Sequence, residues 1–198
     1  MGRLPGVSEG MTGDGRKQMV TVTAGGVSAA VHRVLKTALG ELTVVREGDS
    51  LTGLYFRRHW PRPERAAFGA LSAEGFDEVA RQLGEFLDGY RSGFELPLKV
   101  RGGEFDQRVW ELVAGVRYGE TTTYGELARS LGAGVDPRDV GAAVGRNRLC
   151  IIIPCHRVVG ATGKLTGYAG GLDRKRALLE IEQAGVLRAG CAREARLW

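Results

Sequence analysis

The stretch 123–145, TYGELARSLGAGVDPRDVGAAVG, contains two helix start signals in quick succession. Thr123, with Glu126 three residues later, matches a capping box, and Gly132 follows as a helix end. Asp136, followed directly by a proline, matches a second N-cap. Two short helices joined by a tight glycine-containing turn are typical of a helix-turn-helix.

The second of these predicted helices has little side-chain bulk. It runs from Pro137 to about Arg146 and includes Gly141, Ala142, Ala143 and Gly145. Glycine costs about 1 kcal/mol in a helix interior, so a helix that contains two of them needs its backbone close to a neighbour. Another helix and a nucleic-acid groove explain this feature equally well.

Toward the N-terminus, the pattern predicts a small antiparallel sheet covered by a helix. Strand-like segments are Val31, Arg33–Leu35, Leu42–Val45 and Leu51–Phe56. After a proline-containing loop, apolar residues at a spacing of three and four form one helical stripe: Phe76, Val79, Leu83, Phe86, Leu87 and Tyr90.

Three segments are expected along the chain. Residues 1–28 are polar and glycine-rich without sustained periodicity, which predicts a mobile arm. The connector Gly93–Gly103 separates an N-terminal α/β domain, 29–100, from a C-terminal domain, 101–198. The second domain should open with an amphipathic helix from Phe105 to Val116, closed by Gly119.

The composition limits the class of protein. Hydrophobic residues make up 43% of the 198, enough to fill a core, and no apolar run approaches a membrane span or a signal peptide. Three cysteines do not suggest a disulfide framework, so a reducing, cytoplasmic location is expected. The net charge of +5 suits a nucleic-acid partner, although an arginine-rich solvated surface would give the same charge.

The chemistry is concentrated in residues 151–159, IIIPCHRVV. A strand-like apolar run leads into Cys155, His156 and Arg157. A thiol attacks only as thiolate, and a neighbouring base or positive charge favours that form. Adjacent residues on an extended segment point in opposite directions, however, so this pattern alone favours an inert buried cysteine.

A longer stretch of the sequence favours a reactive cysteine over an inert one. Pro154–Val159, together with Gly167–Leu172, resembles the active-site region of the O6-alkylguanine-DNA alkyltransferases, also called methylated-DNA–protein-cysteine methyltransferases. The resemblance covers most of the chain beyond residue 28. It extends through Phe105, Val109, Trp110, Tyr118, Gly119, Thr123, Tyr124, Leu127, Ala128, Arg138, Val140, Gly141, Asn147, Leu178, Leu179 and Glu182.

The resemblance implies an α+β fold, with an N-terminal ribonuclease-H-like domain of sheet and helices and a C-terminal helical, winged-helix-like DNA-binding domain. It implies DNA repair by irreversible transfer of the alkyl group from O6-alkylguanine, and also O4-alkylthymine, to Cys155 after nucleotide flipping. The expected partner is double-stranded DNA that carries the lesion. No cofactor, membrane or obligate protein partner is expected, and the protein should be a monomer able to assemble cooperatively on DNA.

The resemblance also assigns roles at the reacting end. Cys155 matches the alkyl acceptor, and His156 matches the histidine that acts on it through a bound water. Glu182, on a helix with Asp173 as its expected cap, matches the carboxylate that orients this histidine. Asn147 matches an asparagine that braces the turn before the active-site segment.

The remaining roles concern DNA and the guanine pocket. Tyr124 matches the tyrosine that helps to rotate the nucleotide and donates toward guanine. Arg138 matches the arginine that fills the gap in the duplex. The helix-turn-helix would enter the minor groove, where small residues such as Gly141 and Ala142 permit close approach. The pocket residues are Tyr168, Gly170 and Val158.

Some positions depart from the family pattern. Arg148 stands where a proline is common, and Ala169 replaces a serine found in some members. Zinc-binding members use N-terminal cysteines, but no cysteine precedes Cys150, so no metal is expected.

Two rival functions remain, a non-catalytic protein that binds alkylated DNA and a thiol hydrolase. The run Arg174–Arg176 is either a solvated surface or a set of phosphate contacts.

Overall fold

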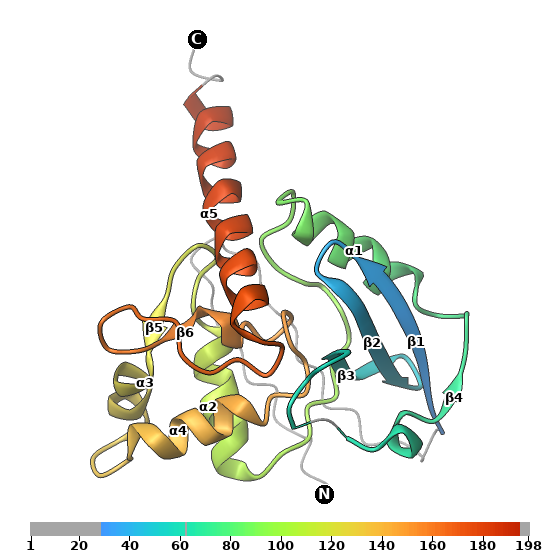
Figure 1. Ribbon diagram of the computed structural model, residues 1–198, viewed down its shortest axis with the longest axis horizontal. Helices are drawn as coiled ribbons and strands as arrows, with labels where there is room; N and C mark the ends of the chain where they lie inside the picture. The colour runs from blue at the N-terminus through green and yellow to red at the C-terminus, as the bar shows by residue number, and fades with distance from the viewer. Residues whose placement is uncertain (1–28, 62, 195–198) are drawn as a thin grey trace, which may run out of the picture.

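The computed structural model describes residues 29–61 and 63–194; the arm predicted for residues 1–28 lies outside them. The N-terminal half contains the predicted antiparallel sheet, formed by β1 (Ala30–Thr37), β2 (Gly40–Glu47) and β3 (Ser50–Phe56) (Figure 1). Sequence analysis missed β4 (Ala70–Leu71), which pairs in parallel with β1 and extends the order to β3-β2-β1-β4. Two residues are too few to show a strand pattern.

The predicted covering helix is α1 (Asp77–Leu87), which follows the short 3-10 turn η1 (Arg65–Phe68) and β4. Its buried side chains, Val79, Leu83 and Phe86, share a core with the sheet residues. The prediction was wrong for Tyr90, which lies beyond the helix end and is 80% exposed.

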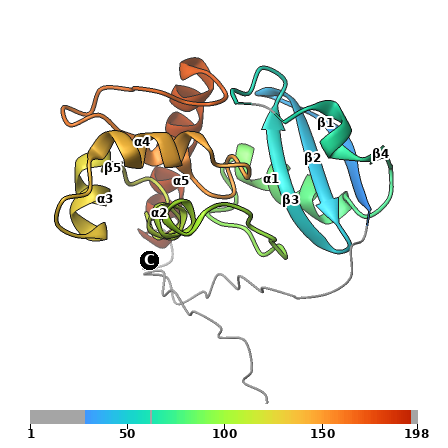
Figure 2. The ribbon, with the colours of Figure 1, turned by 90° about the horizontal axis from the view of Figure 1, so that it is seen from below.

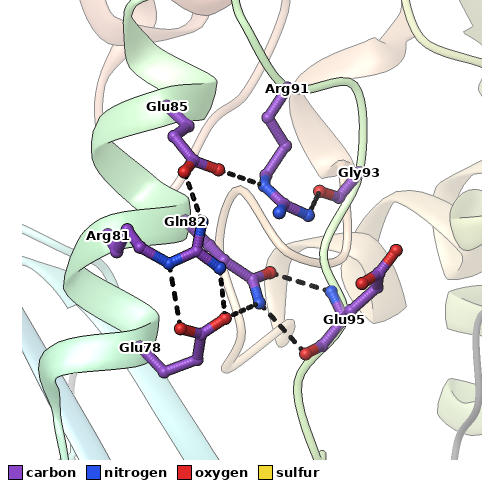
Figure 3. Close-up of polar contacts among 7 residues, drawn as sticks. All are labelled: Glu78, Arg81, Gln82, Glu85, Arg91, Gly93 and Glu95. Carbon is purple, nitrogen blue, oxygen red and sulfur yellow. Dashed lines mark hydrogen bonds and ion pairs between the residues drawn. The ribbon is translucent and has the colours of Figure 1, made fainter.

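A polar network fastens the connector to α1 (Figure 3). The buried side chain of Gln82 donates to the carbonyl of Glu95 at 3.1 Å and accepts from its amide at 2.8 Å. One turn further along, Glu85 accepts from Arg91 at 2.8 Å. These bonds direct the chain from the first half toward the second.

The C-terminal half contains the predicted helix-turn-helix, formed by α3 (Tyr124–Leu131) and α4 (Pro137–Gly145). Both caps are confirmed, with Thr123 and Glu126 in a reciprocal capping box and Asp136 accepting from the backbone of Arg138. The preceding helix, α2 (Glu104–Ala114), ends earlier than predicted, because Gly115 caps it. A two-stranded parallel ribbon of β5 (Thr122–Thr123) and β6 (Val158–Val159) completes a winged-helix-like unit.

The last helix, α5 (Leu172–Glu194), begins beside this unit, and its far end projects from the body of the molecule (Figure 1). Asp173 was predicted as its cap, but the helix begins at Leu172 and Asp173 lies in the first turn. A carboxylate there still interacts favourably with the helix dipole. The buried face of the helix carries Lys175, Leu178 and Glu182.

The two halves share one hydrophobic core. Residues of the sheet, of α1, of α2 to α4 and of α5 belong to a single buried cluster. The backbone also joins the halves, because Leu54 of β3 donates to the carbonyl of Arg148 at 2.7 Å and accepts from the amide of Cys150 at 3.3 Å. The helical unit therefore lies against the sheet edge formed by β3 (Figure 2). The domain boundary near Arg101 remains a prediction.

Candidate active site

A folded-back turn, and not the predicted strand, presents Cys155. Nδ2 of the Asn147 side chain donates to the carbonyl of Ile153 at 2.9 Å, and Oδ1 of the same side chain accepts from the backbone amide of Leu149 at 2.9 Å. Ile151 adopts a left-handed backbone with φ of 72°. A β-branched residue rarely takes this conformation, so the clamp supplied by Asn147 holds a strained turn in place.

The turn leads into a short 3-10 helix, η2, formed by Cys155–Arg157. Its three side chains are all buried, and His156 is completely inaccessible. On an extended strand, the side chains of Cys155 and His156 would point in opposite directions. In this short helix they do not have to. It places a thiol, an imidazole and a guanidinium together in the core.

Glu182 of α5 binds the side chains of the two residues that follow Cys155. Its carboxylate lies 2.7 Å from Nε2 of His156 and accepts from Nε and Nη2 of Arg157 at 2.9 to 3.1 Å. The amide of Gly119 donates to its other oxygen at 2.9 Å. Sequence reasoning missed Arg157 as a partner of Glu182, although it lies within the motif. The carboxylate is fully buried but fully paired.

The pKa directions fit this pairing. Burial raises the pKa of Glu182, but the hydrogen bond and charge of His156, with Arg157, outweigh it and hold the pKa below its usual range. Burial lowers the pKa of His156 despite the carboxylate, which favours a neutral imidazole. Nδ1 of His156 is buried and has no hydrogen-bond partner within the described part of the chain. A neutral ring with an unpaired nitrogen is suited to accept a proton.

Several neighbours favour the thiolate form of Cys155. Its pKa is lowered, first by a hydrogen bond from Cys150 and against the opposing effect of burial, with Asn147 and the charge of Lys175 acting in the same direction as Cys150. The pKa of Cys150 rises well above its usual value for the reciprocal reason and because the residue is buried. A depressed thiol pKa beside a positive charge is typical of a reactive cysteine.

Lys175 is a site residue that sequence reasoning missed. Its ammonium is fully buried and donates to the carbonyls of Val158, Thr166 and Gly167 at 2.6, 2.6 and 3.2 Å. Burial lowers its pKa to about 8, while the neighbouring cysteine opposes that effect. The spacing of positions 175, 178 and 182 on one helix face was the available signal.

The predicted pocket residues surround the same region. Val158 is fully buried, and Gly170 is buried so closely against the Phe56 ring that a Cβ there would lie 2.4 Å from it. The ring of Tyr168 packs edge-on against Phe56, with 6.1 Å between their centroids. The hydroxyl of Tyr168 is buried with no bonding partner among the residues that the structure places, and burial raises its pKa.

Tyr124 links the helix-turn-helix to this pocket. It is the first residue of α3, and its hydroxyl lies 3.5 Å from the carbonyl of Thr166. Its ring lies against Gly141 of α4, where a Cβ would be 3.7 Å away. Burial raises its pKa, so the phenol is protonated and able to donate.

Three of the predicted DNA-binding residues lie on α4, and the fourth, Tyr124, begins α3. Arg138 and Ala142 are exposed, and Gly141 is half-buried. The guanidinium of Arg138 has no hydrogen bond or ion pair with any residue in 29–61 or 63–194. It is therefore free to reach outward. Trp110 fixes the helix from behind by donating to the carbonyl of Ala143 at 2.8 Å.

The described ranges contain neither a candidate metal site nor a helix that could span a membrane. No cluster of three or more His, Cys, Asp or Glu side chains is placed there to hold a metal ion. None of the helices there is both long enough and apolar enough to cross a membrane.

This fold and site define a helix-turn-helix protein with a buried cysteine whose pKa is lowered. Residues 104–184 match the family described as "6-O-methylguanine DNA methyltransferase, DNA binding domain", and residues 30–100 match its "ribonuclease-like domain". The chain belongs to this 6-O-methylguanine DNA methyltransferase family, which confirms the resemblance and the α+β fold.

Individual relatives agree with the family match. The methylated-DNA–protein-cysteine methyltransferase of Mycobacterium tuberculosis is 42% identical over 77% of this chain and 92% of its own length. That of Methanosarcina acetivorans is 38% identical over 76% and 97%. The crystal structure of Mycobacterium tuberculosis OGT in complex with DNA superposes with a TM-score of 0.73 and 41% identity, covering 78% of this chain and 94% of the other.

Proposed function

We propose that this protein repairs DNA by transferring the alkyl group of O6-alkylguanine to Cys155. The relatives carry the name of that activity, and one of them is solved bound to DNA. Family membership supports DNA binding, DNA repair and methyltransferase activity. The single observation that carries the residue assignment is the buried arrangement in which Glu182 holds His156 beside Cys155.

The proposed reaction is one displacement at the alkyl carbon. The bond between Cys155 sulfur and carbon forms as the bond from carbon to O6 breaks, and the electron pair leaves with guanine. Before attack, His156 accepts the thiol proton through a water at its unpaired Nδ1. Tyr124 donates a proton toward the departing base. A thioether is not hydrolysed, so each molecule reacts once.

The DNA step uses the exposed face of α4. The guanine must leave the stack, because its O6 alkyl carbon is out of reach of a buried thiol. Arg138 fills the gap, while the small residues Gly141 and Ala142 let the helix approach the minor groove. Tyr168, Gly170 and Val158 receive the flipped base. We extend the proposal to O4-alkylthymine, to a monomer without an obligate protein partner and to cooperative assembly on DNA.

The test is incubation with a duplex containing labelled O6-methylguanine, followed by mass measurement of the protein and its peptides. We expect one methyl group on the peptide that contains Cys155. Cys155→Ser should abolish transfer and keep DNA binding, because a hydroxyl has similar size but ionises far less readily.

Binding without a mass change in the wild-type protein would instead indicate a non-catalytic binder. Methylation of the Cys155→Ser variant at the same peptide would show that Cys155 is not the acceptor.

A further inference from the structure

Arg174, near the start of α5, lies between the N-terminal sheet and the residues predicted to form the guanine pocket. Its Nε donates to the carbonyl of Leu39 at 2.8 Å, and its Nη1 donates to the carbonyl of Gly170 at 2.8 Å. The guanidinium also lies over the ring of Phe56, 4.9 Å from the centroid. The side chain is half-buried, so Arg174 does not belong to a solvated surface, one of the two interpretations of the run Arg174–Arg176.

One end of this bridge is the pocket loop, residues 166–171. The carbonyl of Gly170 is bound by Arg174, and the carbonyl of Ala169 accepts from the backbone amide of Trp60 at 2.9 Å. Both bonds come from outside the loop. A surface loop that is ordered by a few such bonds opens more often when one of them is lost.

The other end of the bridge is the turn between β1 and β2. The hydroxyl of Thr37 fixes this turn, because it donates to the carbonyl of Gly40 at 2.7 Å and accepts from the amide of Leu39 at 3.2 Å. Gly40 has φ of 99°, and a Cβ there would lie 3.3 Å from Nη2 of Arg174. The turn is therefore shaped closely around the guanidinium and presents the Leu39 carbonyl to it.

We propose that Arg174 is a positioning residue for the base: by bridging the β1–β2 turn to Gly170, it holds the pocket loop in the form that receives guanine. An arginine suits this role, because its planar fork can bind two acceptors while it stacks on an aromatic ring. The identity of the base rests on the proposed function, but the order of the loop can be measured without any reaction.

The bridge should act on binding and not on the chemical step. The hydrogen bonds of Arg174 go to backbone carbonyls of the turn and the loop, whereas the proposed proton transfers use His156 and Tyr124. A loop that has lost the bridge must be ordered when the base enters, and this ordering reduces affinity. Once the base is bound, the displacement at Cys155 should proceed as before.

The first measurement is amide hydrogen exchange of the full chain without DNA, read by mass spectrometry on peptides that cover residues 166–171. Arg174→Met removes both hydrogen bonds, and we expect exchange there to become about tenfold faster, as for the loss of a bond from a charged donor. Arg176→Met, which changes an exposed arginine two residues further along α5, should exchange like the wild type.

The second measurement is the single-turnover rate of methyl transfer from free O6-methylguanine as a function of its concentration. For Arg174→Met, the half-saturating concentration should rise about tenfold, while the limiting rate stays within about twofold of the wild type. If this variant does not fold, Arg174→Gln keeps a polar group at the half-buried position and should shift both measurements in the same direction.

A third variant separates the bridge from the charge of Arg174. Thr37→Val leaves the charge in place but removes the hydroxyl that fixes the turn. Loop exchange and the half-saturating concentration should each rise by about threefold, less than for Arg174→Met. Added to Arg174→Met, the same change should have no further effect on either quantity, because both act through one bridge. Thermal melting identifies the folded variants.

Wild-type loop exchange in a folded Arg174→Met variant would overturn the proposal, as would an unchanged half-saturating concentration or a lower limiting rate alone. An effect of Arg174→Met with none of Thr37→Val would also overturn it, since the charge would then act without the turn. Faster loop exchange in both variants, with no methyl transfer by the wild type, would refute the proposed function and leave the bridge supported.

Discussion

A single carboxylate organises the reacting residues. Glu182 accepts from His156, from Arg157 and from the backbone of Gly119, so each of its oxygens is occupied. Removal of any one partner would leave a buried polar group unsatisfied. The site should therefore respond to substitution as a unit.

The first prediction tests that unity. His156→Ala and Glu182→Gln should each slow transfer by roughly a hundredfold or more, the usual contribution of a positioned base. The double variant should be slower than either single variant by much less than the product of the two effects, because the residues act as one relay. The measurement is the single-turnover rate at saturating methylated duplex.

A matched control for this cycle is Glu180→Gln, which changes an exposed carboxylate on the same helix. It should transfer at the wild-type rate. Multiplicative effects of His156→Ala and Glu182→Gln would show that the two residues act independently.

The second prediction concerns pH and stability. Burial lowers the pKa of His156 in the folded protein, so the unfolded chain takes up this proton first as the pH falls below about 6.5. The stability contributed by neutral His156 is present above that pH and is lost on acidification. Glu182, whose folded pKa is also lowered, adds a loss in the same direction at lower pH.

Urea unfolding at several pH values, for wild type and His156→Gln, measures the His156 contribution. The difference in the free energy of unfolding between the two proteins should decline from pH 7 downward. A difference that grows on acidification would mean that folded His156 is protonated.

At the scale of elements, one face of α4 packs against the protein core and the other face is exposed to solvent. Trp110 anchors the inner face, whereas Arg138 and Ala142 face solvent. Such a helix can enter a groove without rearranging the core. Its proposed purpose is to hold DNA while one nucleotide leaves the stack.

The third prediction follows from that purpose. Arg138→Ala should slow transfer on saturating duplex by roughly tenfold or more, because unstacking costs a few kcal/mol that the guanidinium offsets. Transfer from free O6-methylguanine, which requires no flipping, should change little. Single-turnover rates on both substrates provide the comparison.

Arg129→Ala is the control, since Arg129 is exposed on the neighbouring helix α3. If Arg138 only contacts phosphate, its variant should weaken binding to all DNA and reduce the salt slope by about one unit, while keeping the rate at saturation. That result would remove Arg138 from flipping.

Elements with local signals were predictable from sequence, and those set by distant contacts were not. The caps at Thr123 and Asp136 involve neighbours within three residues, and both were placed correctly. The run at Ile151 was interpreted as a strand because its residues favour one. The side chain of Asn147 and the backbone of Leu54 impose a turn there, and neither contact can be read from local propensity.

The residues of the candidate site also could not be connected with one another from local sequence signals. The roles proposed for Cys155, His156 and Glu182 came from a family resemblance, because Glu182 lies 26 residues from His156 and nothing local connects them. Lys175 was missed because lysine is rarely fully buried, and the run Arg174–Arg176 was interpreted as either a solvated surface or a set of phosphate contacts. Only the folded chain shows that it has three carbonyl partners.

At the scale of the whole molecule, the sheet and the helical unit meet beside the residues that are predicted to form the guanine pocket. Phe56 of β3 packs on Gly170 and Tyr168 of the pocket loop, and Arg174 of α5 lies over the same ring at 4.9 Å. The N-terminal half therefore shapes the pocket without supplying any of the reacting groups proposed here.

The fourth prediction uses this contact. In Gly170→Ala, the added methyl group would lie 2.4 Å from the Phe56 ring and 2.8 Å from Tyr168, so backbone or ring must move. We expect a loss of about 1 to 3 kcal/mol in stability, the usual cost of overpacking. Transfer should slow equally on duplex and on free base, because the pocket itself is displaced.

Gly145→Ala is the matched control, since a Cβ at this helical position meets nothing within 4 Å. Its melting temperature should be unchanged or higher. A Gly170→Ala variant with normal melting and normal rates would show that the loop absorbs the extra group.

The burial of Cys155 has a consequence for the lifetime of the protein after use. Its sulfur lies in a dense core with only 4% of the residue exposed, and the proposed reaction adds a methyl group there permanently. Extra volume in a packed core costs about 1 to 3 kcal/mol. Since about 1.4 kcal/mol is a tenfold change in equilibrium, the spent molecule unfolds more often and becomes a better protease substrate. If the reaction proceeds as proposed, the packing that shields the thiol would also make used copies more accessible to proteases.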